Sequence, residues 1–149
     1  MKQQQKRKIL SLSLVMMLII TLCPVSVKAE SEYTYTQTED GTLAITGYTG
    51  SSSALDIPEE IDGQTVTEIA SKAFQYNLSI QQVTLPDTIT EIGESAFNDC
   101  SRLKTINFSQ SLTDIEDNAF FSCTRLEDIQ LPDHITTLGD GAFYHCSAL

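Results

Sequence analysis

The sequence predicts an α/β-type repeat solenoid, with short parallel strands on one face, short helical turns or extended segments on the other, and a β-hairpin cap at its N-terminal end. Three observations predict this fold class. An octamer frame recurs at a spacing of 23 residues, as AFNDCSRL (96–103), AFFSCTRL (119–126) and AFYHCSAL (142–149). Apolar residues recur in register within each frame, and a separate alternating stretch surrounds Asp40-Gly41. Because one such repeat cannot bury its apolar face alone, the repeats are expected to stack.

Residues 1–29 have the composition of an export signal. The segment opens with four basic residues, Lys2, Lys6, Arg7 and Lys8. An uncharged run over 9–23 follows, and Val27-Lys28-Ala29 is a pattern that a signal peptidase accepts. The run is shorter than the ~20 residues of a spanning helix, which favours cleavage over a retained anchor. A lipoprotein signal at Cys23 is disfavoured, because Leu22 stands where a small residue is needed.

The long basic segment is typical of a Gram-positive bacterial precursor. We therefore expect an exported bacterial protein, either secreted or held at the cell surface or cell wall, with no membrane insertion after signal cleavage. Five of the nine Lys and Arg residues lie before residue 30 and all 20 Asp and Glu residues follow, so 4 basic and 20 acidic side chains remain, a net charge of −16. This charge excludes nucleic acid and anionic lipid as partners bound through charge. It leaves cations and basic partners open, and no motif indicates a cofactor.

Residues 30–53 predict the β-hairpin cap and a connecting loop. The stretch YTYTQTEDGTLAITGYTG alternates polar and apolar residues on both sides of Asp40-Gly41, a turn signal. Such a hairpin would cover the open edge of the first repeat, as a solenoid end requires.

Residues 54–149 predict four repeats, with boundaries at 54–82, 83–105, 106–128 and 129–149, the last one incomplete. In the first, Asn77 replaces the cysteine and an insert around Asp62-Gly63 adds a turn. The later repeats begin with apolar residues at alternate positions, as in Val83 and Leu85, which predicts one parallel strand of about six residues per repeat. A short extended piece, as in residues 90–93, leads into Ala-Phe-x-x-Cys-x-x-Leu, whose apolar spacing predicts a helical turn.

The segments LPDTITEIGESAFNDCSRL and LPDHITTLGDGAFYHCSAL resemble the BspA-like, or Treponema-type, leucine-rich repeats of bacterial surface proteins. The resemblance covers residues 54–149, with departures at Asn77, Ser109 and Glu116. It implies a leucine-rich repeat solenoid, secretion or surface display, and binding of protein or glycan on host or neighbouring cells, including adhesion. It does not imply catalysis.

Three cysteines, Cys100, Cys123 and Cys146, recur in register and are expected to form a structural column of buried parallel thiols. A disulfide between neighbours stays open, because adjacent strands lie within bridging distance. A thiol hydrolase would need a histidine beside the thiol, and only His134 and His145 are available. A zinc site is disfavoured, because three thiols in a line do not surround a tetrahedral ion.

Two acidic columns carry charge of one sign. The first contains Glu68, Glu91 and Asp114, and the second contains Glu94, Asp117 and Asp140. These carboxylates would bind calcium only if both columns converge. Solvated side chains that splay apart are the favoured interpretation, so no metal site is predicted.

The outward side of the strands is the expected recognition surface. Its residues are short, polar and variable, which suits a binding face on a rigid scaffold. The ligand-binding candidates are Gln82, Thr84, Thr105, Asn107, Ser109, Asp128 and Gln130.

Two functions are consistent with this pattern. The first is a secreted or cell-surface binding module for protein or glycan, with no catalysis of its own. The alternative is a targeting or spacer segment of a larger exported enzyme truncated after Leu149. Because the sequence stops inside a repeat, we expect further C-terminal repeats or another chain to cover that end.

Overall fold

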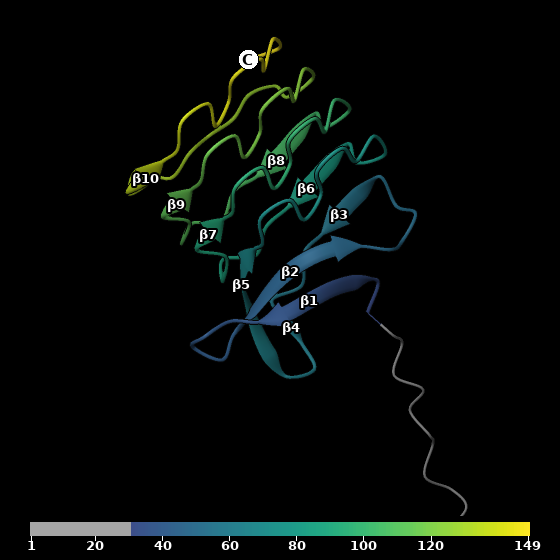
Figure 1. Ribbon diagram of the computed structural model, residues 1–149, viewed down its shortest axis with the longest axis vertical. Coiled ribbons are helices and arrows are strands. Elements are labelled where there is room, and N and C mark those ends of the chain that lie inside the picture. The colour runs from purple at the N-terminus through teal and green to yellow at the C-terminus, as the bar shows by residue number, and fades with distance from the viewer. Residues whose placement is uncertain (1–30) are drawn as a thin grey trace, which may run out of the picture. The chain divides into compact units, whose positions relative to one another are not determined.

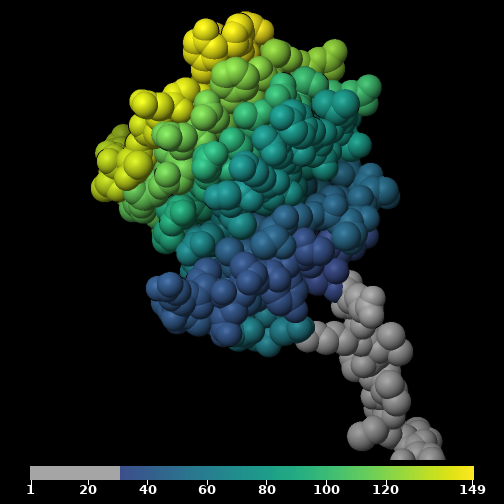
Figure 2. All heavy atoms as spheres, viewed as in Figure 1, coloured from purple at the N-terminus to yellow at the C-terminus, as the bar shows by residue number. Residues whose placement is uncertain are grey.

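The computed structural model of the chain describes residues 31–149, so the signal peptide expected over residues 1–29 lies outside the described residues. The described part is a solenoid of about four turns, in which successive repeats stack from the hairpin to residue 149 (Figure 1). The space-filling view shows the same order as bands of colour that follow one another from blue to yellow (Figure 2). Each repeat therefore packs on its neighbours in sequence, as expected for a repeat solenoid.

The solenoid carries two sheets, in which strands of successive repeats pair in parallel, while β1 pairs with β2 and β4 pairs with β5 antiparallel. The seven-stranded sheet has the order β1-β2-β5-β7-β9-β10, and β4 pairs with β5 beside that path. Its strands are β1 (Tyr33–Gln37), β2 (Leu43–Tyr48), β4 (Glu60–Ile61), β5 (Gln64–Ile69), β7 (Glu91–Ile92), β9 (Asp114–Ile115) and β10 (Thr137–Leu138). The three-stranded sheet contains β3 (Ala54–Asp56), β6 (Gln82–Thr84) and β8 (Thr105–Asn107).

The prediction of one six-residue strand in every repeat is wrong. Each of the first three repeats supplies a strand to both sheets, the first also adds β4, and the fourth supplies only β10. The strands are short because a 23-residue coil must bend several times before it returns to its starting position. Only two or three residues remain straight between these bends in β6, β7, β8, β9 and β10.

The helical turns predicted for the Ala-Phe-x-x-Cys-x-x-Leu segments are also wrong, since residues 31–149 contain no helix. In these segments the backbone N–H groups alternate between two kinds of partner. Those of Ala96, Asn98 and Cys100 donate to carbonyls three residues earlier, while those of Ser95, Phe97 and Asp99 donate to carbonyls of the next repeat.

The cause of this alternation is a positive φ angle at regular places, which a helix does not tolerate. Two columns of the turn segments have φ between 55° and 66°, and their members are Lys72, Ser95, Asn118 and Gly141, and Tyr76, Asp99, Ser122 and His145. The residues are therefore arranged as consecutive tight turns, and half of their hydrogen bonds connect neighbouring repeats.

The hairpin predicted around Asp40-Gly41 is present as the antiparallel pair β1 and β2. Its second strand also pairs in parallel with β5, which places Ile45 opposite Ile69. The side chain of Ile45 is fully buried, and its carbonyl accepts the N–H of Ala70. The hairpin thus occupies the edge of β5, while its capping role stays a prediction.

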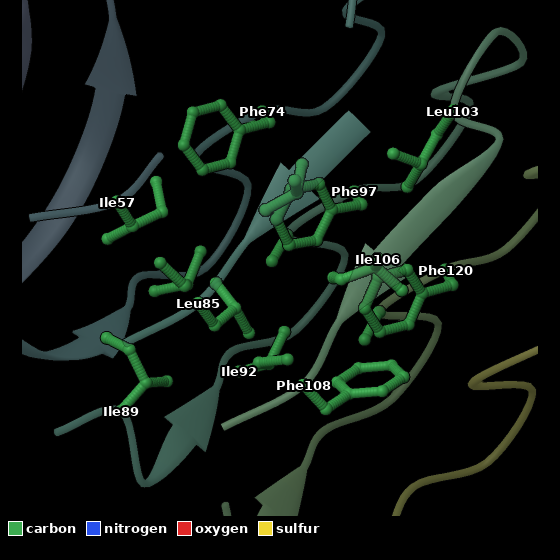
Figure 3. Packing of buried hydrophobic residues seen from close by; sticks show 14 of the residues in the cluster. Ile57, Phe74, Leu85, Ile89, Ile92, Phe97, Leu103, Ile106, Phe108 and Phe120 are labelled. Carbon is green, nitrogen blue, oxygen red and sulfur yellow. The ribbon is translucent and has the colours of Figure 1, made fainter. Parts of the chain in front are cut away.

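The core is built from columns of equivalent side chains. Phe74, Phe97, Phe120 and Phe143 form a phenylalanine ladder with ring centroids 5.0, 5.1 and 5.1 Å apart and nearly parallel planes. Figure 3 shows three of these rings in a row, beside a second row made by Ile57, Leu85 and Phe108. The repeats are therefore held together by stacked side chains as well as by backbone hydrogen bonds.

No helix long and apolar enough to cross a membrane occurs within residues 31–149.

Candidate ligand-binding face

The three-stranded sheet presents an exposed polar face, and four of the predicted binding residues lie on it. In β3, β6 and β8 the middle residue is buried and the two flanking residues are exposed. Gln82 pairs with Thr105, and Thr84 pairs with Asn107. Adjacent parallel strands are about 4.8 Å apart, so these side chains form two regularly spaced rows.

Ser109 does not belong to this face, which corrects the prediction that placed it there. The residue is fully buried, and its hydroxyl oxygen accepts the N–H of Ser111. Phe108 and Ser109 are both buried after β8, and Ser109 takes the place that proline occupies in the other three repeats, as Pro58, Pro86 and Pro132. The sequence pattern could not show this, because alternation stops being a guide where the strand ends.

Asp128 and Gln130 are exposed, but they do not lie on a strand. In earlier repeats the backbone N–H of Ile57 donates to the carbonyl of Thr84, and that of Leu85 donates to the carbonyl of Asn107. Among residues 31–149, the equivalent hydrogen bond from Phe108 to Gln130 is not formed. The backbone of Asp128 has a φ of 47°, so the chain departs from the strand conformation here.

A hollow of about 440 Å³ lies where the three-stranded sheet ends. We call it the β8 hollow, and its lining residues are Ile106, Asn107, Phe108, Gln110, Asp128 and Gln130. It brings together three of the predicted residues, Asn107, Asp128 and Gln130. Sequence reasoning missed Gln110, because its place depends on the break in strand pairing, for which the sequence has no signal.

The first acidic column follows the strands of the seven-stranded sheet. Glu68 pairs with Glu91, which pairs with Asp114. Partial burial raises the pKa of Glu91, and the neighbouring Glu68, Glu116 and Asp114 carboxylates raise it further. Burial also raises the pKa of Glu68.

The pKa of Asp114 is shifted in the opposite direction from those of Glu68 and Glu91, because threonine hydroxyls donate hydrogen bonds to its carboxylate. Its carboxylate accepts hydrogen bonds from Thr113 at 2.6 Å and from Thr136 at 3.2 Å. The bond from Thr113 and those from Thr137 and Thr136 lower the pKa of Asp114. Threonines next to the column thus supply hydrogen-bond donors to one of the stacked carboxylates and stabilise its charged form.

The second acidic column is exposed, and it contains Glu94, Asp117 and Asp140. There the Asp117 carboxylate accepts the backbone N–H of Asp140 at 2.7 Å. Among residues 31–149, no group of three or more acidic, histidine or cysteine side chains is arranged to hold a metal ion. The calcium candidates Glu91, Glu94, Asp114, Asp117 and Asp140 therefore do not converge on one site.

A second hollow, of about 660 Å³, lies between the hairpin and the first acidic column. Four carboxylates line it, from Glu39, Asp40, Glu68 and Glu91. The alignment of repeats could not predict this hollow, since the hairpin lies outside the repeated frame.

Replacing Glu91 with glutamine is expected to stabilise the protein at pH 7. A raised pKa in the folded state means that stability is lost as pH rises through that pKa, so an uncharged side chain restores it. The gain should be at most about 1 kcal/mol, because the side chain is only partly buried and water screens the repulsion. Urea unfolding at pH 7 and pH 3 would measure this gain in stability.

The gain should disappear at pH 3, where the side chain of Glu91 is protonated in both the folded and the unfolded state. The control Glu94→Gln should have a smaller effect on stability at pH 7. An equal gain at both pH values would refute the electrostatic cause.

The three cysteines Cys100, Cys123 and Cys146 are free and buried. Each thiol donates to a phenylalanine carbonyl of the preceding repeat, at 3.1, 3.2 and 3.1 Å for Phe74, Phe97 and Phe120. Burial raises the pKa of Cys100 to about 12. The neighbouring Cys146 thiol and burial raise the pKa of Cys123. The Cys100 and Cys123 thiols therefore remain protonated at neutral pH and are poor nucleophiles, whereas the neighbouring Cys123 lowers the pKa of Cys146.

The first repeat replaces the cysteine with Asn77, whose side chain makes different hydrogen bonds. Its amide oxygen accepts the N–H groups of Ser79 and Ile80. The imidazole of His145 packs edge-on against the Tyr144 ring, with centroids 4.4 Å apart. Its ring also lies 5.9 Å from that of Phe121. The sequence could place His145 outside the core but not identify these aromatic partners.

Comparison with known proteins points to one repeat family. Residues 53–149 match a family model described as BspA type leucine-rich repeat region. No curated protein matches the chain. Several solved structures do match, and the ones described next come from bacterial leucine-rich repeat proteins.

A leucine-rich repeat protein of T. pallidum is 31% identical, with a TM-score of 0.69 over 79% of this chain and 66% of that protein. A leucine-rich cell surface protein of Faecalibacterium prausnitzii is 34% identical, with a TM-score of 0.73 over 80% of this chain and 34% of that one. A leucine-rich repeat protein of Bacteroides capillosus is 35% identical, with a TM-score of 0.67 over 75% and 86% of the two chains. The chain thus spans less than two thirds of the first two structures.

Proposed function

Because the chain belongs to the BspA-type leucine-rich repeat family of bacterial surface proteins, we propose that it is a secreted or cell-surface binding module without catalytic activity. Its partner is a protein or glycan on a host or neighbouring cell, so the module serves adhesion. A similar structure is that of a cell surface protein, and a second, 26% identical, is that of a pneumococcal vaccine antigen. Both descriptions support a location outside the cell, as does the export signal expected from the sequence.

The observation that carries this proposal is the exposed polar face of the three-stranded sheet. Gln82, Thr84, Thr105 and Asn107 lie there at regular spacing, and the buried residues between them fix their positions. A face of this kind needs no rearrangement to bind a partner, which reduces the entropic cost of binding. The three thiols are buried and donate to backbone carbonyls rather than to a catalytic base, which supports the absence of catalysis.

Binding by this face can be tested with the purified protein and the variant Thr105→Arg, which places a long charged side chain in the centre of the face. The probes are immobilised fibronectin, fibrinogen, laminin and mucin, together with an array of neutral and acidic glycans, and binding is followed by surface plasmon resonance. We expect at least one probe to bind and Thr105→Arg to weaken it at least tenfold. The control Thr124→Arg, at an exposed threonine of a turn segment, should bind as the unmodified protein does. Equal binding by both variants would exclude the face as the site.

The hairpin of β1 and β2 is, in the same proposal, the cap of the solenoid. Its second strand supplies hydrogen-bond partners to β5, and Leu43 and Ile45 bury apolar surface of the first repeat. An uncovered parallel strand would present unpaired backbone groups to other chains. The hairpin therefore prevents strand pairing of this end of the module with other chains.

A further inference from the structure

We propose that the β8 hollow is the specificity site of the exposed face and that it binds an uncharged sugar unit of a glycan. The proposal rests on the function proposed above and narrows its partner to one chemical class. The hollow lies at the end of the three-stranded sheet, between Asn107 on β8 and Gln130 of the fourth repeat. Its volume of about 440 Å³ lies within the range of small-ligand sites.

The lining residues have the hydrogen-bonding character that sugar hydroxyls need. Asn107, Gln110 and Gln130 are carboxamides, and each of them has both an acceptor oxygen and a donor nitrogen. A hydroxyl group also donates and accepts, so neighbouring hydroxyls of a sugar can pair with one carboxamide. Asp128 adds a carboxylate, which accepts stronger, charge-assisted hydrogen bonds.

The base of the hollow is apolar and rigid. Ile106 and Phe108 belong to the core and are only 6% and 8% exposed. The Phe108 ring packs edge-on against Phe120 of the phenylalanine ladder, with centroids 5.7 Å apart. The base thus offers one small apolar contact for the C–H groups of a sugar ring, while the ring's hydroxyls reach the polar rim.

The charge of the hollow disfavours acidic glycans. None of its six lining residues is basic, and Asp128 is acidic. A sialic acid, uronic acid or sulfated sugar would bring its negative charge next to this carboxylate without a compensating cation. The site therefore favours neutral hexoses and N-acetylhexosamines over acidic sugars.

A peptide fits the hollow less well than a sugar. Protein-binding sites concentrate their affinity in aromatic and arginine side chains. The two apolar lining residues offer little exposed surface, and the rest of the lining is polar. Such a site is suited to many hydrogen bonds and little apolar burial.

The departure of Asp128 from strand conformation creates the site. Its φ of 47° directs the fourth repeat away from β8, whereas the equivalent residues Gln82 and Thr105 lie in paired strands. A positive φ at a non-glycine residue costs about 1 kcal/mol or more, and such strain is often found at functional positions. The break in strand pairing thus gives this face one concave point.

The test uses an array of neutral oligosaccharides of hexose and N-acetylhexosamine, with sialylated and sulfated oligosaccharides beside them. Bound sugars are then titrated into ¹⁵N-labelled protein and followed by NMR. We expect neutral oligosaccharides to bind and to shift the amide signals of Asn107, Gln110 and Gln130. Asn107→Leu and Gln130→Leu should each weaken binding at least tenfold. The control Thr124→Leu, at an exposed threonine of a turn segment outside both the binding face and the hollow, should change it less than twofold. Thermal unfolding checks that every variant is folded.

Preferred binding of acidic sugars, or equal loss in Thr124→Leu, would overturn the inference. Failure of all sugars while a protein probe binds and is lost in Thr105→Arg would also overturn it, and the proposed binding face would survive. If none of the sugar or protein probes binds, both proposals fail.

Discussion

Replacing Phe97 with alanine should lower the free energy of unfolding by about 3–5 kcal/mol. The ring is fully buried in the middle of the phenylalanine ladder, where it stacks on Phe74 at 5.0 Å and on Phe120 at 5.1 Å. The substitution removes both contacts and leaves a cavity that the fixed backbone cannot fill. The loss is a large share of the roughly 5–15 kcal/mol by which a domain is stable, so part of the protein should unfold at 37 °C. Urea unfolding followed by circular dichroism measures the loss.

Phe143→Ala is the matched control for this effect. Phe143 has the same place in its repeat, but it stacks on Phe120 alone and is only partly buried. Its loss should be roughly half of that of Phe97→Ala. Equal losses for both variants would show that contacts across repeats do not determine the stability of the ladder.

Ile45→Ala should cost about 2–5 kcal/mol and should loosen the contact between the hairpin and the first repeat. Ile45 is fully buried, lies opposite Ile69 in the pairing of β2 with β5, and its carbonyl accepts the Ala70 N–H. If the hairpin is a cap, β5 becomes an open edge when the hairpin detaches. We therefore expect faster hydrogen exchange at the Ala70 amide and concentration-dependent association in light scattering.

The control for this prediction is Ile135→Ala, which removes a partly buried isoleucine from the fourth repeat. It should cost less stability and leave exchange at Ala70 unchanged. A variant Ile45→Ala that is destabilised but remains monomeric at all concentrations would mean that Ile45 is only a core residue. The proposed capping role of the hairpin would then be wrong.

The 23-residue frame was enough to predict the interior of the solenoid. Ala96, Phe97, Cys100 and Leu103 are all fully buried, as their equivalents in the next repeat are. Such columns are predictable because burial in a stacked repeat acts on the same position in every turn. The exposed face that carries Gln82 and Thr105 follows from the same reasoning. Side chains alternate along a strand, so these two residues point away from the core, into which Val83 and Ile106 point.

The local backbone could not be predicted in the same way. Apolar spacing at 97, 100 and 103 is shared by a helix and by a series of tight turns. The difference lies in the positive φ angles of Ser95 and Asp99, which neither side chain reveals. The β8 hollow was missed for a related reason, because Asp128 matches its column in sequence and departs from it only in conformation.

Hydrogen-bonded threonines of neighbouring repeats are a constant 23 positions apart. This constant spacing affects how a gene that encodes such repeats can change length. Thr90 donates to Thr67, Thr113 to Thr90 and Thr136 to Thr113, each across 23 residues. Gain or loss of one whole repeat by recombination between equivalent codons leaves each remaining donor with an equivalent acceptor. The reading frame and the hydrogen-bond register are therefore preserved together, so the array can lengthen or shorten in one genetic step without redesign of its core.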